Sequence, residues 1–240
     1  MFFDSPLNLS HSLLNVFGIK TSIHYPERIP DIKKILIISN HRSILDAPLL
    51  MTAMNRPVRF VCHYFMSRAP IMRSLVSMMG AFPLNASNQP QNKFFQQSTN
   101  FLQSSEAVGI FPEGAQPMVQ VNLPNQLSPF YRGFAHLAFR VPVEELAILP
   151  IAIASTEEKR YSLAPMKLFS LFDPSEPLFD CWSLHPAIIY RHVNILFGHP
   201  IWITETERQH YRGKAGRVLA RELTQSCSHQ IAELLAQVMQ

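Results

Sequence analysis

The chain has 240 residues, of which 47% are hydrophobic, and a formal net charge of +4. This length suits one large domain or two small ones and can bury a substantial core. The composition excludes an intrinsically disordered chain, which would combine low hydrophobicity with high net charge. No apolar run reaches the roughly 18 residues expected of a spanning helix, and the N-terminus lacks the basic start of a signal peptide. Any membrane contact is therefore expected to be peripheral.

The positive charge is concentrated between Lys33 and Lys93. Eight basic residues and one acidic residue give this segment a charge of +7, whereas 13 basic and 16 acidic residues give the rest −3. A basic segment attracts anions such as lipid phosphates, an acidic carrier protein or nucleic acid, although a solvated face without a partner fits equally well. Nucleic acid is not expected, because zinc-finger spacing, an RNP-like aromatic motif and basic helix periodicity are all missing.

The pattern of apolar residues predicts short strands alternating with helices. In chain order it predicts a helix over 9–17, an extended linker through Pro26 and Pro30, a strand over 35–38, a helix ending near Met54, a strand over 58–62, helices over 65–79 and 93–104, a strand over 107–111, a helix over 131–140, strands over 147–154, 188–197 and 201–203, and a helix over 217–239. Pro150 is expected at a bulge or an edge. This alternation predicts an α/β fold with a mixed, largely parallel β-sheet flanked by helices.

Three parts of the chain are expected from this pattern. Residues 1–32 would form an N-terminal amphipathic and linker segment, residues 33–204 the core, and residues 205–240 a C-terminal amphipathic helix packed on the core. The three cysteines contain no C-x-x-C pair, which argues against a disulfide framework or a zinc site and fits a reducing compartment.

His41 closely follows the expected strand over 35–38, and Asp46 stands five residues further on. If a helix begins between them, the carboxylate can return to the imidazole, accept its Nδ1–H and leave Nε2 free to accept a proton. Since no serine completes a triad, a substrate hydroxyl would be the nucleophile. The spacing also fits simple helix capping, with Ser43 as the cap and Asp46 bound to the backbone. The residues alone leave both interpretations open.

Glu113 lies between Pro112 and Gly114, where the expected strand over 107–111 ends. The tight turn could supply polar contacts to an acceptor or to a developing oxyanion. An ordinary turn with a solvated glutamate is the simpler interpretation of these residues in isolation. Sites in α/β sheets lie beyond the C-terminal ends of strands, and both His41 and Glu113 are expected there.

Six segments of the chain, taken in order, resemble the lysophosphatidic acid acyltransferase family (the 1-acylglycerol-3-phosphate O-acyltransferases). They are Asn40-His41-Arg42-Ser43-Ile44-Leu45-Asp46, Gly80-Ala81-Phe82-Pro83-Leu84-Asn85, Phe111-Pro112-Glu113-Gly114, Pro129-Phe130-Tyr131-Arg132-Gly133, Ile148-Leu149-Pro150-Ile151-Ala152 and Phe197-Gly198-His199-Pro200-Ile201. The resemblance extends from about Lys33 to Ile203. One segment would be weak evidence, but six in the family's order are specific.

The resemblance implies a glycerolipid-acyltransferase-like fold and an O-acyltransferase. Its co-substrate would be an acyl thioester, either acyl-CoA or acyl-ACP, and its acceptor a lysoglycerolipid, with lysophosphatidate as the leading candidate. His41 would be the general base and Asp46 would orient it. The substrate-binding residues that the resemblance implies are Asn40, Ser43, Asn85, Phe111, Pro112, Glu113, Gly114, Gln116 and Arg132. It implies neither a metal nor a further cofactor.

The resemblance further implies a peripheral position on the cytoplasmic face of a membrane, with a possible acyl carrier protein as partner. The expected helix over 65–79, with Arg68 and Arg73 among apolar residues, resembles the family's membrane-leaning helix. A plain core helix fits its composition equally well.

Two departures from the family's pattern concern the acceptor's phosphate. Asn85 stands where the family usually has Arg, and Ala115-Gln116-Pro117 where it commonly has Thr-Arg-Ser. Arg suits phosphate through its planar fork of donors, whereas Asn and Gln bring no charge. The sequence therefore keeps open an acceptor without a phosphate, such as another lysolipid, a glycolipid or an alcohol. Arg42, Arg73 or Arg132 could replace the missing charge.

Two other functional classes are weaker. A non-catalytic lipid-binding relative is disfavoured by the intact His41 and Asp46. A metalloenzyme based on His185, His192 and His199 is not expected, because a spacing of seven in an extended chain puts successive side chains on opposite faces.

Overall fold

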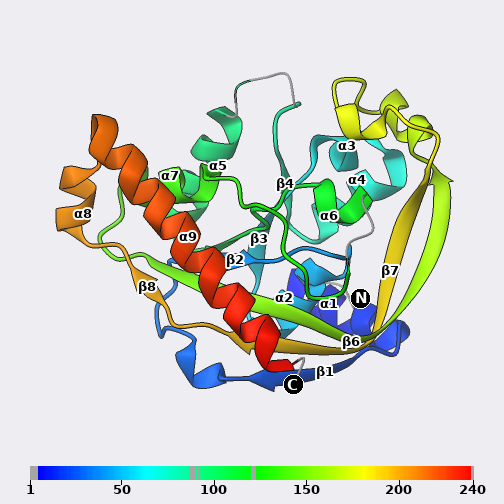
Figure 1. The fold of residues 1–240 in the computed structure, drawn as a ribbon, viewed down its shortest axis with the longest axis horizontal. Helices are drawn as coiled ribbons and strands as arrows, with labels where there is room; N and C mark the ends of the chain where they lie inside the picture. Colours follow the sequence, from blue (N-terminus) through cyan, green and yellow to red (C-terminus); the bar gives the residue numbers. More distant parts are fainter. Residues whose placement is uncertain (1–4, 87–89, 91, 120–122, 239–240) are drawn as a thin grey trace.

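An eight-stranded sheet runs through the middle of the molecule. A computed structural model describes residues 5–86, 90, 92–119 and 123–238. Within these residues the strands are β1 (Lys20–His24), β2 (Ile35–Ser39), β3 (Val58–Cys62), β4 (Phe82–Pro83), β5 (Ala107–Ile110), β6 (Ala147–Pro165), β7 (Leu184–Phe197) and β8 (Ile201–Trp202). Their order is β1-β7-β6-β2-β5-β3-β4, with β8 also beside β6 (Figure 1).

The sheet is mixed and largely parallel, which confirms the predicted fold class. All neighbouring pairs run parallel except β6 with β7 and β6 with β8. The five residues of β2 are all buried, as expected for a central strand that has helices on both of its faces.

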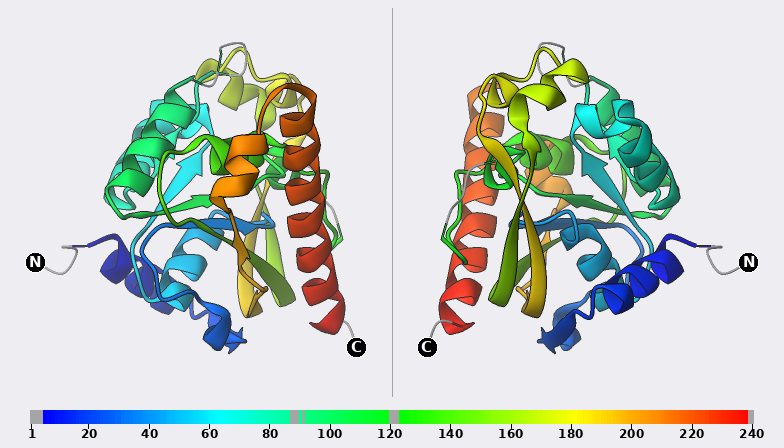
Figure 2. Two further views of the ribbon diagram at one scale, coloured as in Figure 1. Left: turned by 90° about the vertical axis from the view of Figure 1, so that its left-hand side faces the viewer. Right: turned by 90° about the vertical axis from the view of Figure 1, so that its right-hand side faces the viewer.

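Helices cover both faces of the sheet. They are α1 (Pro6–Val16), α2 (Asp46–Met54), α3 (Tyr64–Arg68), α4 (Pro70–Met78), α5 (Asn92–Gln103), α6 (Gln116–Val119), α7 (Gly133–Arg140), α8 (Glu205–His210) and α9 (Gly213–Val238), with 3-10 turns η1 (Pro26–Arg28), η2 (Met166–Leu171) and η3 (Pro177–Phe179). Figure 2 shows the sheet between α9 on one side and α1 and α2 on the other. Among the described residues, no helix combines the length and the apolar character needed to span a membrane.

Two apolar cores hold these layers together. On one face, Leu102 of α5, Phe134 of α7 and Ile231 of α9 are among the buried residues. On the other, Leu9 of α1 and Leu49 of α2 pack against the sheet. The C-terminal helix is therefore docked on the core through one face, as its apolar spacing predicts.

The N-terminal segment contains a strand that the sequence did not predict. β1 pairs in parallel with β7 at the edge of the sheet. Four of its five residues are exposed, so its sequence lacks the alternation of apolar and polar residues that would predict a strand. Residues 18–32 thus contain sheet structure where only a linker was expected.

The single helix expected over 65–79 is wrong. It is two helices, α3 and α4, separated at Ala69, whose backbone is extended (φ −69°, ψ 124°). The ring of a proline disfavours helical backbone at the residue before it, so Pro70 ends the first helix and starts the second.

The expected edge or bulge position of Pro150 is also wrong. Pro150 lies on a central strand, opposite Ile38 of β2. Its carbonyl accepts the N–H of Gly198 at 2.8 Å. Gly198 lies between β7 and β8, which pair with the parts of β6 on either side of Pro150. Because N–H and C=O of a strand residue point to the same side, the N–H that proline lacks falls at this junction, and no ladder bond with β2 is lost.

Candidate active site

His41 and Glu113 lie beyond the C-terminal ends of neighbouring parallel strands. β2 ends at Ser39 and β5 at Ile110, and the two strands pair directly. This arrangement confirms the expected location at one edge of the sheet. The backbone N–H of His41 donates to Oε1 of Glu113 at 2.8 Å, so the two loops are joined.

The imidazole of His41 is bound to Asp46. Its Nδ1 lies 2.8 Å from Oδ2 of Asp46, and the His41 side chain is 19% exposed. Asp46 opens α2, so the turn between β2 and that helix brings the carboxylate back to the ring. Since Asp46 is an acceptor, Nδ1 carries the proton and the lone pair of neutral His41 lies on Nε2.

Four donors converge on the buried carboxylate of Asp46. Oδ2 accepts the ring N–H of His41 and the backbone N–H groups of Arg42 (2.6 Å) and Ser43 (2.9 Å), and Oδ1 accepts the hydroxyl of Tyr190 at 2.7 Å. Asp46 is 0% exposed. These four hydrogen bonds satisfy the buried carboxylate and fix its position.

The two interpretations of Asp46 prove to be compatible. The carboxylate binds the ring of His41 and the preceding backbone at the same time. One part of the capping interpretation is wrong, because Ser43 is not the cap of the helix. The residue before α2 is Leu45, and no side chain caps this helix. The hydroxyl of Ser43 instead donates to the carbonyl of Ile188 at 2.6 Å and accepts the N–H of Leu45.

Glu113 is buried, with 1% of its surface exposed. Its second oxygen, Oε2, accepts the N–H of Ser128 at 2.5 Å, so both oxygens bind backbone amides. Burial raises the pKa of the Glu113 carboxyl, and the bonds from Ser128 and His41 oppose this without cancelling it. The carboxylate thus joins the loop that follows β2 to the chain around Ser128.

Asn40 and Phe111 both help to hold His41 in place. The amide of Asn40 donates to the carbonyl of Ile153 at 2.9 Å and accepts its N–H at 2.8 Å, which anchors the loop to β6. The ring of Phe111 stacks on the imidazole, with centroids 4.2 Å apart and planes 11° apart.

Arg42 is engaged in an ion pair. It donates through Nε and Nη2 to the two oxygens of Glu158, at 2.8 and 2.6 Å, and both side chains are at most 9% exposed. The suggestion that Arg42 replaces a phosphate-binding arginine therefore loses support, because its guanidinium is already bound to a carboxylate.

The remaining predicted site residues lie in turns or at the ends of helices and strands. Gly114 has φ +69° and lies in the same turn as Pro112, whose carbonyl accepts the N–H of Tyr131 at 2.8 Å. This bond brings the exposed Arg132, at the start of α7, next to the turn that carries Glu113. Gln116 begins α6, and Asn85 follows β4 and donates to the carbonyl of Pro90.

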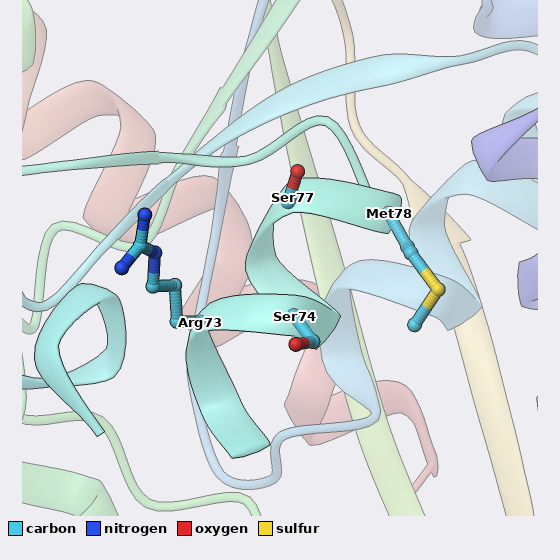
Figure 3. Close-up of a pocket in the computed structure, with 4 residues that line it drawn as sticks. All are labelled: Arg73, Ser74, Ser77 and Met78. Carbon is cyan, nitrogen blue, oxygen red and sulfur yellow. The ribbon is translucent and has the colours of Figure 1, made fainter. Parts of the chain in front are cut away.

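A surface pocket of about 530 Å³ lies on α4. It is lined by Arg73, Ser74, Ser77 and Met78, whose side chains are drawn in Figure 3. Arg73 and Met78 are both exposed, so this helix presents a cation and an apolar side chain together. None of the four residues belongs to the group around His41.

Three residues that contact the site were not predicted from the sequence. Tyr190 binds Asp46, Ser128 binds Glu113 and Glu158 binds Arg42. Tyr190 and Glu158 lie more than 100 residues from their partners in the chain, and none of the three stands in a recognisable motif. The contacts of Tyr190 and Glu158 arise only when β6 and β7 take their places in the sheet.

Comparisons with known proteins identify the fold and the family of this chain. The 1-acyl-sn-glycerophosphate (LPA) acyltransferase PlsC from Thermotoga maritima has a similar fold, with a TM-score of 0.61 at 14% identity over 98% of this chain and 78% of that one. A search of curated proteins finds no match. The family model described as Acyltransferase matches residues 20–154, which include His41, Asp46 and Glu113. Because this match covers more than half of its length, the chain belongs to the Acyltransferase family and is an acyltransferase.

Proposed function

We propose that this enzyme transfers a fatty acyl chain from an acyl thioester, acyl-CoA or acyl-ACP, to the hydroxyl of a lysoglycerolipid, with lysophosphatidate as the leading acceptor. Nε2 of His41 takes the hydroxyl proton while the oxygen attacks the thioester carbonyl. The tetrahedral intermediate then expels the thiolate, which receives the proton from the imidazolium. The products are an ester and a free thiol in equal amounts.

The observation that carries this proposal is the bond between Nδ1 of His41 and the buried carboxylate of Asp46. It fixes the tautomer and stabilises the imidazolium that forms as the hydroxyl loses its proton. A neutral imidazole is too weak a base to deprotonate an alcohol outright, because even water has a pKa of about 15.7. Proton transfer must therefore accompany C–O bond formation, a form of catalysis typically worth about 10²–10⁴-fold.

Three of the other predicted residues then have positioning roles. Glu113 and Asn40 hold the His41 loop through backbone bonds, and Phe111 fixes the plane of the imidazole. We assign Glu113 to positioning rather than to acceptor binding, because its two oxygens are already bound to N–H groups and its side chain is buried.

Arg132 is the residue we propose to bind the acceptor's phosphate. It is exposed beside the Glu113 turn, whereas Arg42 is bound to Glu158. PlsC of Thermotoga maritima is named for 1-acyl-sn-glycerophosphate, a phosphate-bearing acceptor. A neutral acceptor is the second candidate, favoured by the uncharged Asn85 and Gln116.

We also propose a peripheral position on the cytoplasmic face of a membrane. From the end of β6 to the start of β7 the chain exposes six large apolar side chains, namely Tyr161, Leu163, Leu168, Leu171, Trp182 and Leu184. With Arg73 and Met78 on α4, they supply apolar contacts and positive charge suited to an anionic lipid surface.

The proposal is tested by incubating the purified protein with acyl-CoA or acyl-ACP and a panel of lysolipids, followed by mass spectrometry of the ester and a thiol assay. His41→Ala should lower the rate by about 10²–10⁴-fold without altering the circular dichroism spectrum. His192→Ala is the matched control, because His192 also binds a carboxylate, that of Glu157 at 2.6 Å, but lies outside the site. An unchanged rate in His41→Ala would refute the general-base role.

A further inference from the structure

A second polar cluster lies away from His41, where the end of β3 meets the segment between η2 and η3. His63 directly follows β3 and precedes α3, and Asp173 and Glu176 come more than 100 residues later. Aromatic rings hold the two segments together: Phe65 packs on Phe179 with centroids 5.2 Å apart. Figure 1 shows the later segment, in yellow, beside α3.

The three polar side chains converge within this apolar surrounding. Nε2 of His63 lies 2.8 Å from Oε2 of Glu176, and Nδ1 lies 4.0 Å from Oδ2 of Asp173. Each residue offers a ligand atom within 4.8 Å of those of the other two. Their side chains are 16%, 11% and 0% exposed for His63, Glu176 and Asp173 respectively.

Asp173 has a buried carboxylate oxygen that lacks a hydrogen-bond donor. Oδ1 accepts the N–H and the hydroxyl of Ser175, but Oδ2 has no such partner among the described residues, although it faces His63. Burying an anionic oxygen without a partner is costly, and an exception of this kind in a folded protein calls for an unseen water or ion.

We propose that His63, Asp173 and Glu176 bind a divalent transition-metal cation, with Zn²⁺ as the best match. One imidazole nitrogen and two carboxylate oxygens are ligands that Zn²⁺ accepts, whereas Ca²⁺ and Mg²⁺ prefer oxygen alone. With a neutral imidazole the two carboxylates carry −2, which a divalent cation balances. A water molecule would complete a four-coordinate site.

The cation takes the place of the proton between Nε2 of His63 and Glu176. The ring proton then resides on Nδ1, so the long 3.3 Å bond from the N–H of Phe65 is given up. Ligand atoms of a tetrahedral zinc site lie roughly 3.3 Å apart, given bond lengths of about 2.0–2.2 Å. Side-chain rotation has to widen the 2.8 Å contact and draw Asp173 inward.

Such a site would fix the apolar segment between β6 and β7 to the end of β3. Besides the packing of aromatic rings, the ion pair of His63 with Glu176 and the approach of His63 to Asp173 link these parts. A bound cation stabilises the folded state by mass action, because the unfolded chain does not hold the three ligands together. Zn²⁺ should therefore raise the melting temperature of the protein.

The test is a calorimetric titration of the chelator-treated full chain with Zn²⁺ alone, with the melting temperature measured in parallel. We expect one bound cation per chain and a higher melting temperature. Glu176→Gln and Asp173→Asn should each weaken binding by about 10-fold or more and remove the shift. Glu157→Gln, which disrupts the exposed pair with His192, is the matched control and should bind normally.

Two results would overturn the proposal. One is the failure of the wild-type chain to bind Zn²⁺ at micromolar concentration. The other is binding that persists unchanged in Glu176→Gln, since the cation would then be held elsewhere. If Asp173→Asn does not fold, Glu176→Gln alone tests the proposal. The side chain of Glu176 is partly exposed, and this substitution replaces only one carboxylate oxygen by an amide NH₂.

Discussion

The hydroxyl of Tyr190 donates to Oδ1 of Asp46 at 2.7 Å, and both residues are completely buried. Burial, followed by the nearby charge of Asp46, raises the pKa of Tyr190 well above its usual value, so the phenol keeps the proton it donates. The hydrogen-bonded pair of His41 and Asp46 is therefore stabilised by a residue of β7, a strand that lies far from both in the sequence.

Tyr190→Phe should lower kcat by about tenfold, equivalent to about 1.4 kcal/mol, with KM little changed. It removes one hydroxyl and leaves a buried carboxylate oxygen without its donor, which costs about 1–3 kcal/mol of stability. Steady-state kinetics and urea unfolding measure the two effects. Tyr161→Phe is the control, since Tyr161 is 49% exposed on β6. Equal kcat in both variants would show that Asp46 needs no support from Tyr190.

The sequence was sufficient to predict the position of the site but not its full set of contacts. β2, β3 and β5 were predicted from short and mainly apolar runs, and His41 and Glu113 follow β2 and β5. The pair of His41 and Asp46 was predictable because the two residues are five apart and Asp46 begins the helix, which makes their contact a local one.

What could not be predicted depends on distant parts of the chain. β6 continues to Pro165 and β7 begins at Leu184, but these extensions are largely polar or exposed and carry no regular alternation. Glu158 and Tyr190 reach the site only through this long antiparallel pair. The role of Glu113 was likewise hidden, because its burial and its two amide partners follow from tertiary packing.

Glu113→Gln should lower activity by up to about 10²-fold, a loss that small misplacements of a catalytic group can cause. An amide offers one acceptor oxygen, so either the N–H of His41 or that of Ser128 loses its partner. The effect should appear in kcat, measured with the acyl-transfer assay. Wild-type activity in this variant would contradict the positioning role of Glu113.

The stability of Glu113→Gln relative to wild type should depend on pH. Because burial raises the pKa of Glu113, the carboxyl binds its proton more tightly in the folded state than in the unfolded state. Its contribution to stability is then complete below the ordinary value of 4.5 and is lost as the pH rises through the raised value. The stability difference between wild type and Glu113→Gln should therefore shrink from acid to neutral pH in urea unfolding experiments.

Glu158→Gln should show the opposite dependence on pH. Burial alone would raise the pKa of Glu158, but the bonds from Arg42 outweigh it and hold the pKa below its usual value. The stabilisation is present above the ordinary value of 4.5 and is lost as the pH falls through the lowered value. At neutral pH the variant should be less stable by about 3 kcal/mol, because a buried arginine loses its partner.

The control for Glu158→Gln is its neighbour. Glu157→Gln alters an exposed pair with His192 and should change stability by less than about 1 kcal/mol. Urea unfolding of wild type, Glu158→Gln and Glu157→Gln at several pH values distinguishes the buried pair from the exposed pair. A Glu158→Gln variant whose deficit persists unchanged at low pH would show that its loss is not due to the charge on Glu158.

Arg132→Ala distinguishes the two candidate acceptor classes. If Arg132 binds the phosphate, its removal should raise KM for lysophosphatidate by about 10-fold or more, the size expected when a hydrogen bond to a charged group is lost. KM for a neutral monoacylglycerol should not change, since that acceptor has no phosphate for the guanidinium to bind. Arg140→Ala is the control, because Arg140 is also exposed but lies at the opposite end of α7. If Arg132→Ala affects both acceptors equally, Arg132 does not recognise the phosphate. If wild type already prefers the neutral acceptor, the uncharged Asn85 and Gln116 are the better guide to its substrate.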